Sequence, residues 1–204
     1  MAPVTAALGE LAEDPYLATY LATAAVMLSA RLAYLLVTRE GKRPVRRLGD
    51  TVLLAATASF LLPVPLAYAL TDLFALWDYH LPAPLRLAGL ALIAAAGLLI
   101  WRAHADLGRN FAAAPGWRGD HALVTSGVYR RVRHPMYAGL LLWGAAMPLA
   151  LPNYIVGVVP PVVFALFILH RVPLEERLLE EQFGDAYCRY QASTGRLVPR
   201  RRRG

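Results

Sequence analysis

The chain has 204 residues, of which 57% are hydrophobic and only 17% are charged, against roughly 25% charged residues in an average soluble domain. This length suits one domain, and this composition argues against a soluble globule. Lys and Arg outnumber Asp and Glu by 21 to 14, and the single cysteine, Cys188, excludes an internal disulfide. In so apolar a chain, with a mean hydropathy of +0.42, the basic excess indicates membrane orientation rather than nucleic-acid binding.

Apolar runs bounded by charge predict an all-α, multi-pass membrane protein, because a helix needs about 20 apolar residues to cross a bilayer core. The five predicted transmembrane helices cover residues 16–37, 51–70, 85–101, 136–151 and 154–170. The last two come from one uncharged run that is too long for a single crossing, and Pro152 and Asn153 near its middle predict a turn. We expect residues 1–204 to form one domain, with a cytoplasmic amphipathic helix after the fifth span.

Two prolines lie inside the second predicted span, at Pro63 and Pro65. A membrane helix tolerates proline when neighbouring segments satisfy the carbonyls that proline leaves without a donor. We therefore keep 51–70 as a span and expect such a neighbour.

Basic residues predict the orientation of the chain. Arg31 lies within the first span and Arg86 in the second connection, so 21 − 2 = 19 bases fall in the first loop, the third loop and the C-terminal tail. By the positive-inside rule these three segments face the cytoplasm. We expect an inner (cytoplasmic) membrane protein with its N-terminus outside and its C-terminus inside, and residues 1–14 lack the basic start of a signal peptide.

Polar residues that can do chemistry gather in the third loop and after the fifth span. Pro135 suits the first turn of a helix, so the fourth span is predicted to begin there, with His134 just outside it. The free N–H groups of that helix start, flanked by Arg133 and His134, predict an anion site at the membrane surface. The alternative is that the arginines only mark the cytoplasmic side, whereas the flanking Tyr129 and Tyr137 favour a site.

A second polar group follows the fifth span. If the helix continues there, Arg171 and Glu175 share one face, and Glu176 lies about 100° round the axis. Pro173 predicts a kink where the membrane ends. The alternative is an ordinary solvated helix face, but Glu175 lies within about one turn of the span and beside an arginine at the same depth.

These residues match the pattern of a known family. The string Arg133-His-Pro-Met-Tyr-Ala-Gly139, with Trp143-Gly144 and Glu175-Glu176, resembles the signature of the isoprenylcysteine carboxyl methyltransferases, membrane enzymes related to phospholipid methyltransferases. Flanking strings agree with it: His121-Ala-Leu-Val124, Gly127-Val-Tyr129, and Phe183-Gly-Asp-Ala-Tyr187 with Tyr190. The resemblance covers about residues 110–199, the expected catalytic region, and the first two spans match only in hydrophobicity.

The resemblance implies methyl transfer from S-adenosylmethionine to a carboxylate on a prenylated or lipid-like membrane acceptor. It places the adenine and ribose against His121, Ala122, Leu123 and Val124, with Tyr129 closing that pocket. It places the methionine end of the cofactor against His134, Pro135, Met136 and Tyr137, and its ammonium against Glu175, with Glu176 also among the cofactor-binding residues. Arg171 corresponds to the residue that meets the acceptor carboxylate, so Arg171 and Glu175 are the expected catalytic residues. The loop between Asn110 and His121 receives no assignment.

The chemistry of such a reaction agrees with what the sequence lacks. A carboxylate acceptor is already ionised at neutral pH and needs no general base, and the sequence shows no convincing Ser/His/Asp or Cys/His set.

Cys188 is predicted to be a small packing residue. The histidines lack metal-ligand spacing, so no metal is expected. The tail Arg200–Arg203 either binds anionic headgroups or is a disordered anchor.

Two other functions stay open at this point. The same cofactor site can serve an amine headgroup or a small thiol, although Arg171 argues against a cationic amine. A non-catalytic scaffold or transporter predicts ionisable residues inside the spans, where only Arg31 qualifies. The expected partners are a lipophilic carboxylate and the bilayer, without nucleic acid, and the oligomeric state is open.

Overall fold

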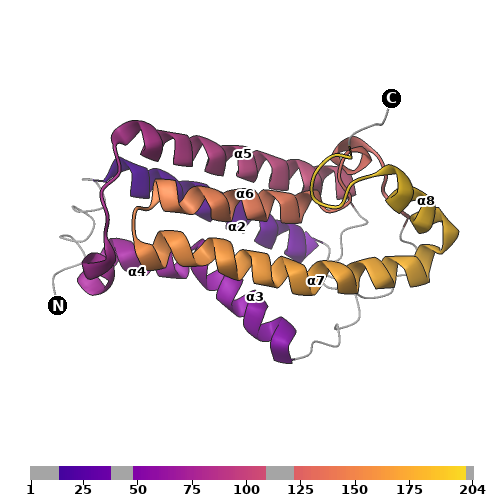
Figure 1. Ribbon diagram of the computed structural model, residues 1–204, viewed down its shortest axis with the longest axis horizontal. Helices are drawn as coiled ribbons and strands as arrows, with labels where there is room; N and C mark the ends of the chain where they lie inside the picture. The colour runs from indigo at the N-terminus through magenta and orange to yellow at the C-terminus, as the bar shows by residue number, and fades with distance from the viewer. Residues whose placement is uncertain (1–13, 38–47, 109–121, 201–204) are drawn as a thin grey trace.

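The computed structural model describes residues 14–37, 48–108 and 122–200, and these ranges form helices without a named β-strand, as predicted. The helices are α2 (Pro15–Val37), α3 (Leu48–Leu61), α4 (Pro63–Leu70), η1 (Asp72–Trp77), α5 (Ala83–Leu107), η3 (Gly127–Arg130), α6 (Pro135–Ala150), η4 (Tyr154–Val158), α7 (Val159–Phe183) and α8 (Asp185–Ser193). Figure 1 shows α5, α6 and α7 running in alternating directions along one axis. The start of α6, the end of α7 and α8 therefore share one end of the bundle, and η1 and the turn before η4 share the other.

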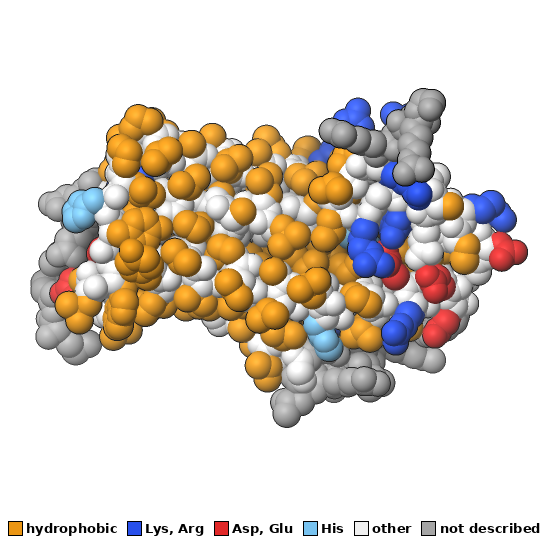
Figure 2. Space-filling view, viewed as in Figure 1, with side chains coloured by type: hydrophobic (Ala, Val, Ile, Leu, Met, Phe, Trp, Pro, Cys, Tyr) orange, Lys and Arg blue, Asp and Glu red, His pale blue; other side chains and the backbone are white. Residues whose placement is uncertain are grey.

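The helices have the composition of a membrane protein. Residues 51–70, 83–107 and 154–183 are long and apolar enough to cross a bilayer, whereas Pro135–Ala150 and Pro15–Ser29 are shorter apolar helices. Apolar side chains cover most of the face in Figure 2, and charged side chains gather at the end that carries α8. This distribution agrees with an integral membrane protein, and the count of five spans stays a prediction.

The second predicted span is broken rather than continuous. Its α3 ends at Leu61 and α4 begins at Pro63. Pro65 has no N–H with which to reach the Leu61 carbonyl four residues earlier, and the Tyr20 hydroxyl of α2 donates to that carbonyl at 3.1 Å. The expectation that a neighbouring segment satisfies a freed carbonyl is confirmed.

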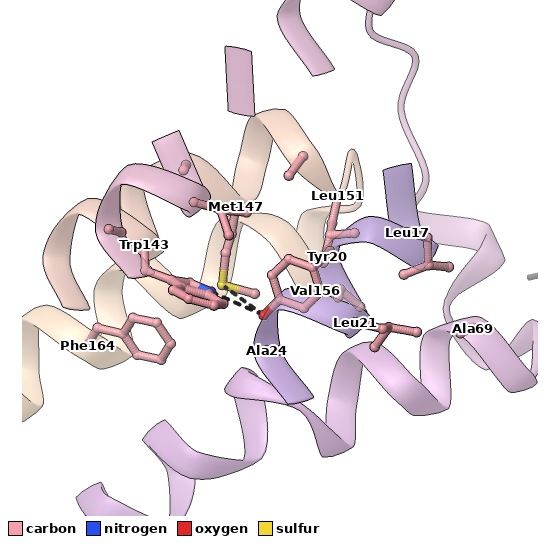
Figure 3. Packing of buried hydrophobic residues seen from close by; sticks show 14 residues of the cluster. Leu17, Tyr20, Leu21, Ala24, Ala69, Trp143, Met147, Leu151, Val156 and Phe164 are labelled. Atoms are coloured by element: carbon pink, nitrogen blue, oxygen red, sulfur yellow. Dashed lines mark hydrogen bonds between the residues drawn. The ribbon is translucent and has the colours of Figure 1, made fainter. Parts of the chain in front are cut away.

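Tyr20 also lies at the centre of the main core. Its ring is fully buried, and it accepts a hydrogen bond from Trp143 Nε1 at 3.3 Å. Figure 3 shows Met147 and Trp143 of α6 meeting Tyr20 of α2, with Phe164 of α7 beyond the indole. One polar atom thus ties together the first, second and fourth apolar segments.

The predicted turn at Pro152 and Asn153 is confirmed. Asn153 is fully buried, and its side-chain oxygen accepts from the backbone N–H of Ile155 and of Val156, both at 2.9 Å. Its Nδ2 donates to the Phe74 carbonyl and to Asp78 Oδ1, both at 2.8 Å. Because one side chain both caps η4 and binds the η1 region, it fixes the hairpin that returns α7 toward the site.

Two helices extend beyond the spans predicted within them. The third helix continues to Leu107 rather than ending at residue 101, and the fifth continues to Phe183 rather than ending at residue 170, with Pro173 inside it. The expected amphipathic C-terminal helix is therefore divided between the end of α7 and α8. Hydropathy marks where a bilayer ends, whereas a helix ends where its backbone turns, here at Gly184 with φ +49°. Cys188 on α8 is exposed, which contradicts its predicted packing role.

Small residues bring α5 and α6 close together. A Cβ added at Gly89 would lie 2.5 Å from the Ala150 nitrogen, and one added at Gly139 would lie 2.6 Å from Ile100 Cγ1. Glycine at such positions lets two membrane helices approach backbone to backbone. This contact holds the start of α6 against the end of α5.

Candidate functional site

The start of α6 is paired with the C-terminal strap, the name used here for residues 194–197. His134 is the N-cap residue before Pro135, as predicted. The backbone N–H of Arg133 donates to Gly195 O at 2.8 Å and that of His134 donates to Arg196 O at 3.0 Å. Val132 and Gly195 form an isolated parallel bridge. The residues before α6 are thus held by backbone as well as side-chain contacts.

Glu176 accepts hydrogen bonds from two arginines within this region. Arg133 Nη2 and Nε donate to Glu176 Oε1 at 2.7 and 3.1 Å, and Arg196 Nη2 donates to Glu176 Oε2. The Glu176 side chain is 5% exposed. A carboxylate buried this deeply is stable only because charged donors reach both of its oxygens.

His134 joins the same cluster. Its Nε2 lies 3.3 Å from Glu176 Oε1, and its ring lies 5.9 Å, centroid to centroid, from that of Tyr137. The predicted anion site beside α6 therefore has both flanking side chains, Arg133 and His134, directed at Glu176.

Glu175 has a different set of neighbours. Its Oε1 accepts from the Tyr137 hydroxyl at 2.6 Å and from Arg171 Nε at 2.9 Å. The expected placement of Arg171 and Glu175 on one helix face is confirmed by this ion pair. The Glu175 side chain is 27% exposed, and among the described residues no side chain donates a hydrogen bond to its Oε2.

The loop before α6 is fixed from α5 and α8. Asp106 on α5 accepts from Val128 N at 2.8 Å and pairs with Arg102 at 3.0 Å. Gly127 has φ +59°, and a Cβ there would collide with the Asp106 carboxylate. On the other side, the Tyr190 hydroxyl donates to the Tyr129 carbonyl at 2.5 Å.

Two buried tyrosines of α8 face this loop and the Glu176 cluster. Burial raises the pKa of Tyr190 to about 12, and burial followed by the nearby Glu176 charge raises the pKa of Tyr187. Both hydroxyls therefore keep their protons at neutral pH. Tyr190 can then act as a permanent donor to the loop.

The predicted site residues are partly brought together. His134, Pro135, Met136 and Tyr137 begin α6, and they lie beside Arg171, Glu175 and Glu176 of α7. Tyr129 is buried in η3, and Ala122, Leu123 and Val124 lie outside any helix or strand and are half-buried to exposed. His121 lies outside the described residues. The cofactor roles of all these residues stay predictions.

Sequence reasoning gave no role to two groups that shape the site. Asp106 anchors the loop, and its i,i+4 spacing from Arg102 was an available signal. Arg196 contacts Glu176 across 20 residues of chain, and no local pattern marks such a pair. In the described part of the chain, no group of three or more His, Cys, Asp or Glu side chains has the arrangement of a metal site.

Comparison with known proteins agrees with this region. Residues 87–181 match the model of the isoprenylcysteine carboxyl methyltransferase (ICMT) family. This segment of the chain is therefore similar to the enzymes of that family. The matched range runs from α5 through the start of α6 to Glu181, and so includes Arg171, Glu175 and Glu176.

Individual relatives are similar in sequence to part of this chain. Protein-S-isoprenylcysteine O-methyltransferase A of Arabidopsis thaliana is 42% identical over 79 residues, 39% of this chain and 40% of that protein. Protein-S-isoprenylcysteine O-methyltransferase B of the same plant is 35% identical over 113 residues, 54% of this chain and 57% of that protein. The chain thus spans about half the length of these relatives.

A solved structure is similar over a larger share of the chain. The eukaryotic intramembrane Ras methyltransferase ICMT superposes with a TM-score of 0.54 and 28% sequence identity, covering 76% of this chain and 54% of that one. The helical arrangement, and not only the motif region, therefore resembles this membrane fold.

Proposed function

We propose that this chain is an S-adenosylmethionine-dependent carboxyl O-methyltransferase that forms a methyl ester on a prenylated or lipid-like membrane acceptor. The observation that carries the proposal is the Glu175 carboxylate, held by Tyr137 and Arg171 where the apolar part of α7 gives way to its charged end. The family match and the names of the relatives support it.

The donor set at this place fits the cofactor. S-adenosylmethionine supplies an electrophilic methyl group on a sulfonium, and it also carries an ammonium and a carboxylate. Glu175 is suited to the ammonium because it is partly exposed and has one oxygen beyond its two contacts. Tyr137 fixes that carboxylate by its hydroxyl and offers an aromatic face for a cation. His134, with Pro135 and Met136, is proposed for the carboxylate end, and residues 121–124 with Tyr129 for the adenosine end.

Arg171 is proposed to hold the acceptor carboxylate. Its Nε is occupied by Glu175, and the planar guanidinium has four further N–H donors on its two Nη atoms. A fork of this kind fixes both oxygens of a carboxylate. The acceptor needs no deprotonation, so the chain's task is alignment in a site shielded from water.

The same place suits a reaction between a polar cofactor and a lipophilic acceptor. Charged side chains gather at this end of the molecule (Figure 2), whereas the helices behind it are apolar. We propose that this end faces the cytoplasm and that the N-terminal end faces outside, because 19 of the 21 basic residues fall in segments assigned to this side.

The direct test is methyl transfer by the full chain in lipid nanodiscs. Methyl-labelled S-adenosylmethionine is incubated with an S-prenylated cysteine that has a free carboxylate, and label is measured as a base-labile ester. The amide of the same compound is the matched control and is expected to accept no label. Label in phospholipid or on a small thiol instead would replace the carboxylate acceptor with one of the alternative acceptors.

Arg171→Ala tests whether Arg171 binds the acceptor carboxylate while Glu175 binds the cofactor. We expect the KM for the prenylated acceptor to rise at least about tenfold, because one charge-assisted contact is lost, while S-adenosylmethionine affinity stays within about twofold. Arg171→Lys retains the charge without the fork and is expected to fall between Arg171→Ala and the native chain. Equal losses of acceptor use and cofactor affinity would assign Arg171 to the support of Glu175.

A further inference from the structure

We propose that Glu176 is a positioning residue. Its carboxylate ties the C-terminal strap, residues 194–197, to the start of α6, and the strap in this position holds the site residues in place. This inference rests on the proposed function where it predicts a change in S-adenosylmethionine affinity. The change that it predicts in amide hydrogen exchange does not depend on that function.

The adjacent carboxylates of Glu175 and Glu176 on α7 differ in how accessible they are to a ligand. Glu175 is 27% exposed and Glu176 is 5% exposed. Both oxygens of Glu176 already accept from arginines, Oε1 from Arg133 and Oε2 from Arg196. A ligand's ammonium would therefore have to compete with an arginine at either oxygen of a carboxylate that is almost fully buried.

Arg133 makes the link to the strap rigid. Two of its nitrogens hold Glu176, while Nη1 donates to the backbone carbonyls of Gln191, at 3.2 Å, and Thr194. One guanidinium therefore joins α7, the end of α8 and the strap, and its side chain is only 10% exposed.

The strap in turn holds the backbone that orients His134. The Arg133 and His134 amides donate to Gly195 and Arg196 carbonyls, so a strap that moves away leaves both amides without those acceptors. Further along the strap, Leu197 packs against the buried cluster that contains Phe167 and Val172, and Tyr137, the residue that fixes Glu175, packs against the same cluster. Displacement of the strap should thus change the positions of both His134 and Glu175.

The test compares Glu176→Gln, Arg196→Ala and the double variant with the native chain in nanodiscs. Glu176→Gln keeps the shape and removes the charge. Arg196 is 54% exposed, so its truncation leaves the core intact and keeps the test informative if Glu176→Gln folds poorly. Arg189→Ala, an exposed arginine of α8 outside the cluster, is the matched control.

The measurements are S-adenosylmethionine affinity by calorimetry and hydrogen exchange of the Arg133 and His134 amides. We expect each single variant to weaken affinity about tenfold, the loss of about one charge-assisted hydrogen bond, and to speed exchange at both amides. The double variant should be less than additive, because both changes break one linkage. Arg189→Ala should match the native chain.

Two results would overturn the proposal. One is weaker affinity in Glu176→Gln with native amide exchange, together with native behaviour of Arg196→Ala; Glu176 would then contact the cofactor directly. The other is unchanged exchange in all variants. If the native chain binds no S-adenosylmethionine, the proposed function fails, while the exchange measurement still decides whether Glu176 holds the strap.

Discussion

The two ends of the bundle differ in how completely their buried polar side chains are hydrogen-bonded. At the η1 end, Asn153 is fully buried and its side chain makes four hydrogen bonds, while Asp78 accepts from both Asn153 and the Tyr68 hydroxyl. At the α8 end, Glu176 is satisfied by Arg133 and Arg196. Next to Glu176, however, Glu175 keeps one oxygen beyond its contacts with Tyr137 and Arg171.

This difference separates a closed structural network from an incomplete one. A network whose donors and acceptors are all matched stabilises one conformation and has little left for a ligand. A partly exposed carboxylate beside an arginine and a tyrosine has capacity for a cation. The contrast predicts that changes at the η1 end act on stability and changes at Glu175 act on function.

The largest expected effect is that of Glu175→Gln on methyl transfer. Loss of the negative charge at the proposed ammonium site should lower kcat/KM at least about 100-fold, or about 2.7 kcal/mol of transition-state stabilisation. Thermal unfolding should stay close to that of the native chain because Gln retains an acceptor for Tyr137. The exposed Glu181→Gln on the same helix is the matched control, and equal activity of the two variants would contradict the proposed site.

Asn153→Ala should have the largest effect on stability. It removes hydrogen bonds to Phe74 and Asp78 and the cap of η4, so we expect a loss of about 3 kcal/mol, measured by thermal or denaturant unfolding in nanodiscs. Val158→Ala, a half-exposed position after the same turn, should lose less than about 1 kcal/mol. Reduced methyl transfer with native stability would break the proposed contrast between the two ends.

Gly127→Ala should have an intermediate effect on the loop. The added methyl meets the Asp106 carboxylate at a residue with φ +59°, so we expect a cost of about 2 kcal/mol and weaker cofactor binding by calorimetry. Gly108→Ala, also at positive φ but with nothing within 4 Å, isolates backbone strain from the collision. Similar affinities in both variants would show that the Asp106 contact is unimportant.

Arg86→Ala should have the smallest effect. Arg86 pairs with Asp14 at 2.7 Å and lies 4.1 Å from the centroid of the Tyr16 ring, but it is at the end remote from Glu175. We expect a stability loss of at most about 1 kcal/mol and native methyl transfer in the labelled assay. A clear loss of transfer would mean that the two ends are energetically coupled.

Local patterns predicted several features of the fold and site. Proline chemistry placed the helix start at Pro135 and the turn before Asn153, and i,i+4 spacing placed Arg171 beside Glu175. Each of these depends on hydrogen bonding or geometry within a few residues. The helix ends at Leu107 and Phe183 escaped prediction because the change in hydropathy does not coincide with the end of a helix.

The apolar runs, the charge asymmetry and the motif strings were readable from the sequence alone, since composition decides which segments favour a bilayer and spacing decides which side chains share a helix face. Only the tertiary structure decided how Arg133 reaches Glu176 across 43 residues of chain and how the strap meets the start of α6. It also decided that neighbouring Glu175 and Glu176 have different partners. Contacts between distant segments depend on how whole helices pack, and no local spacing encodes that arrangement.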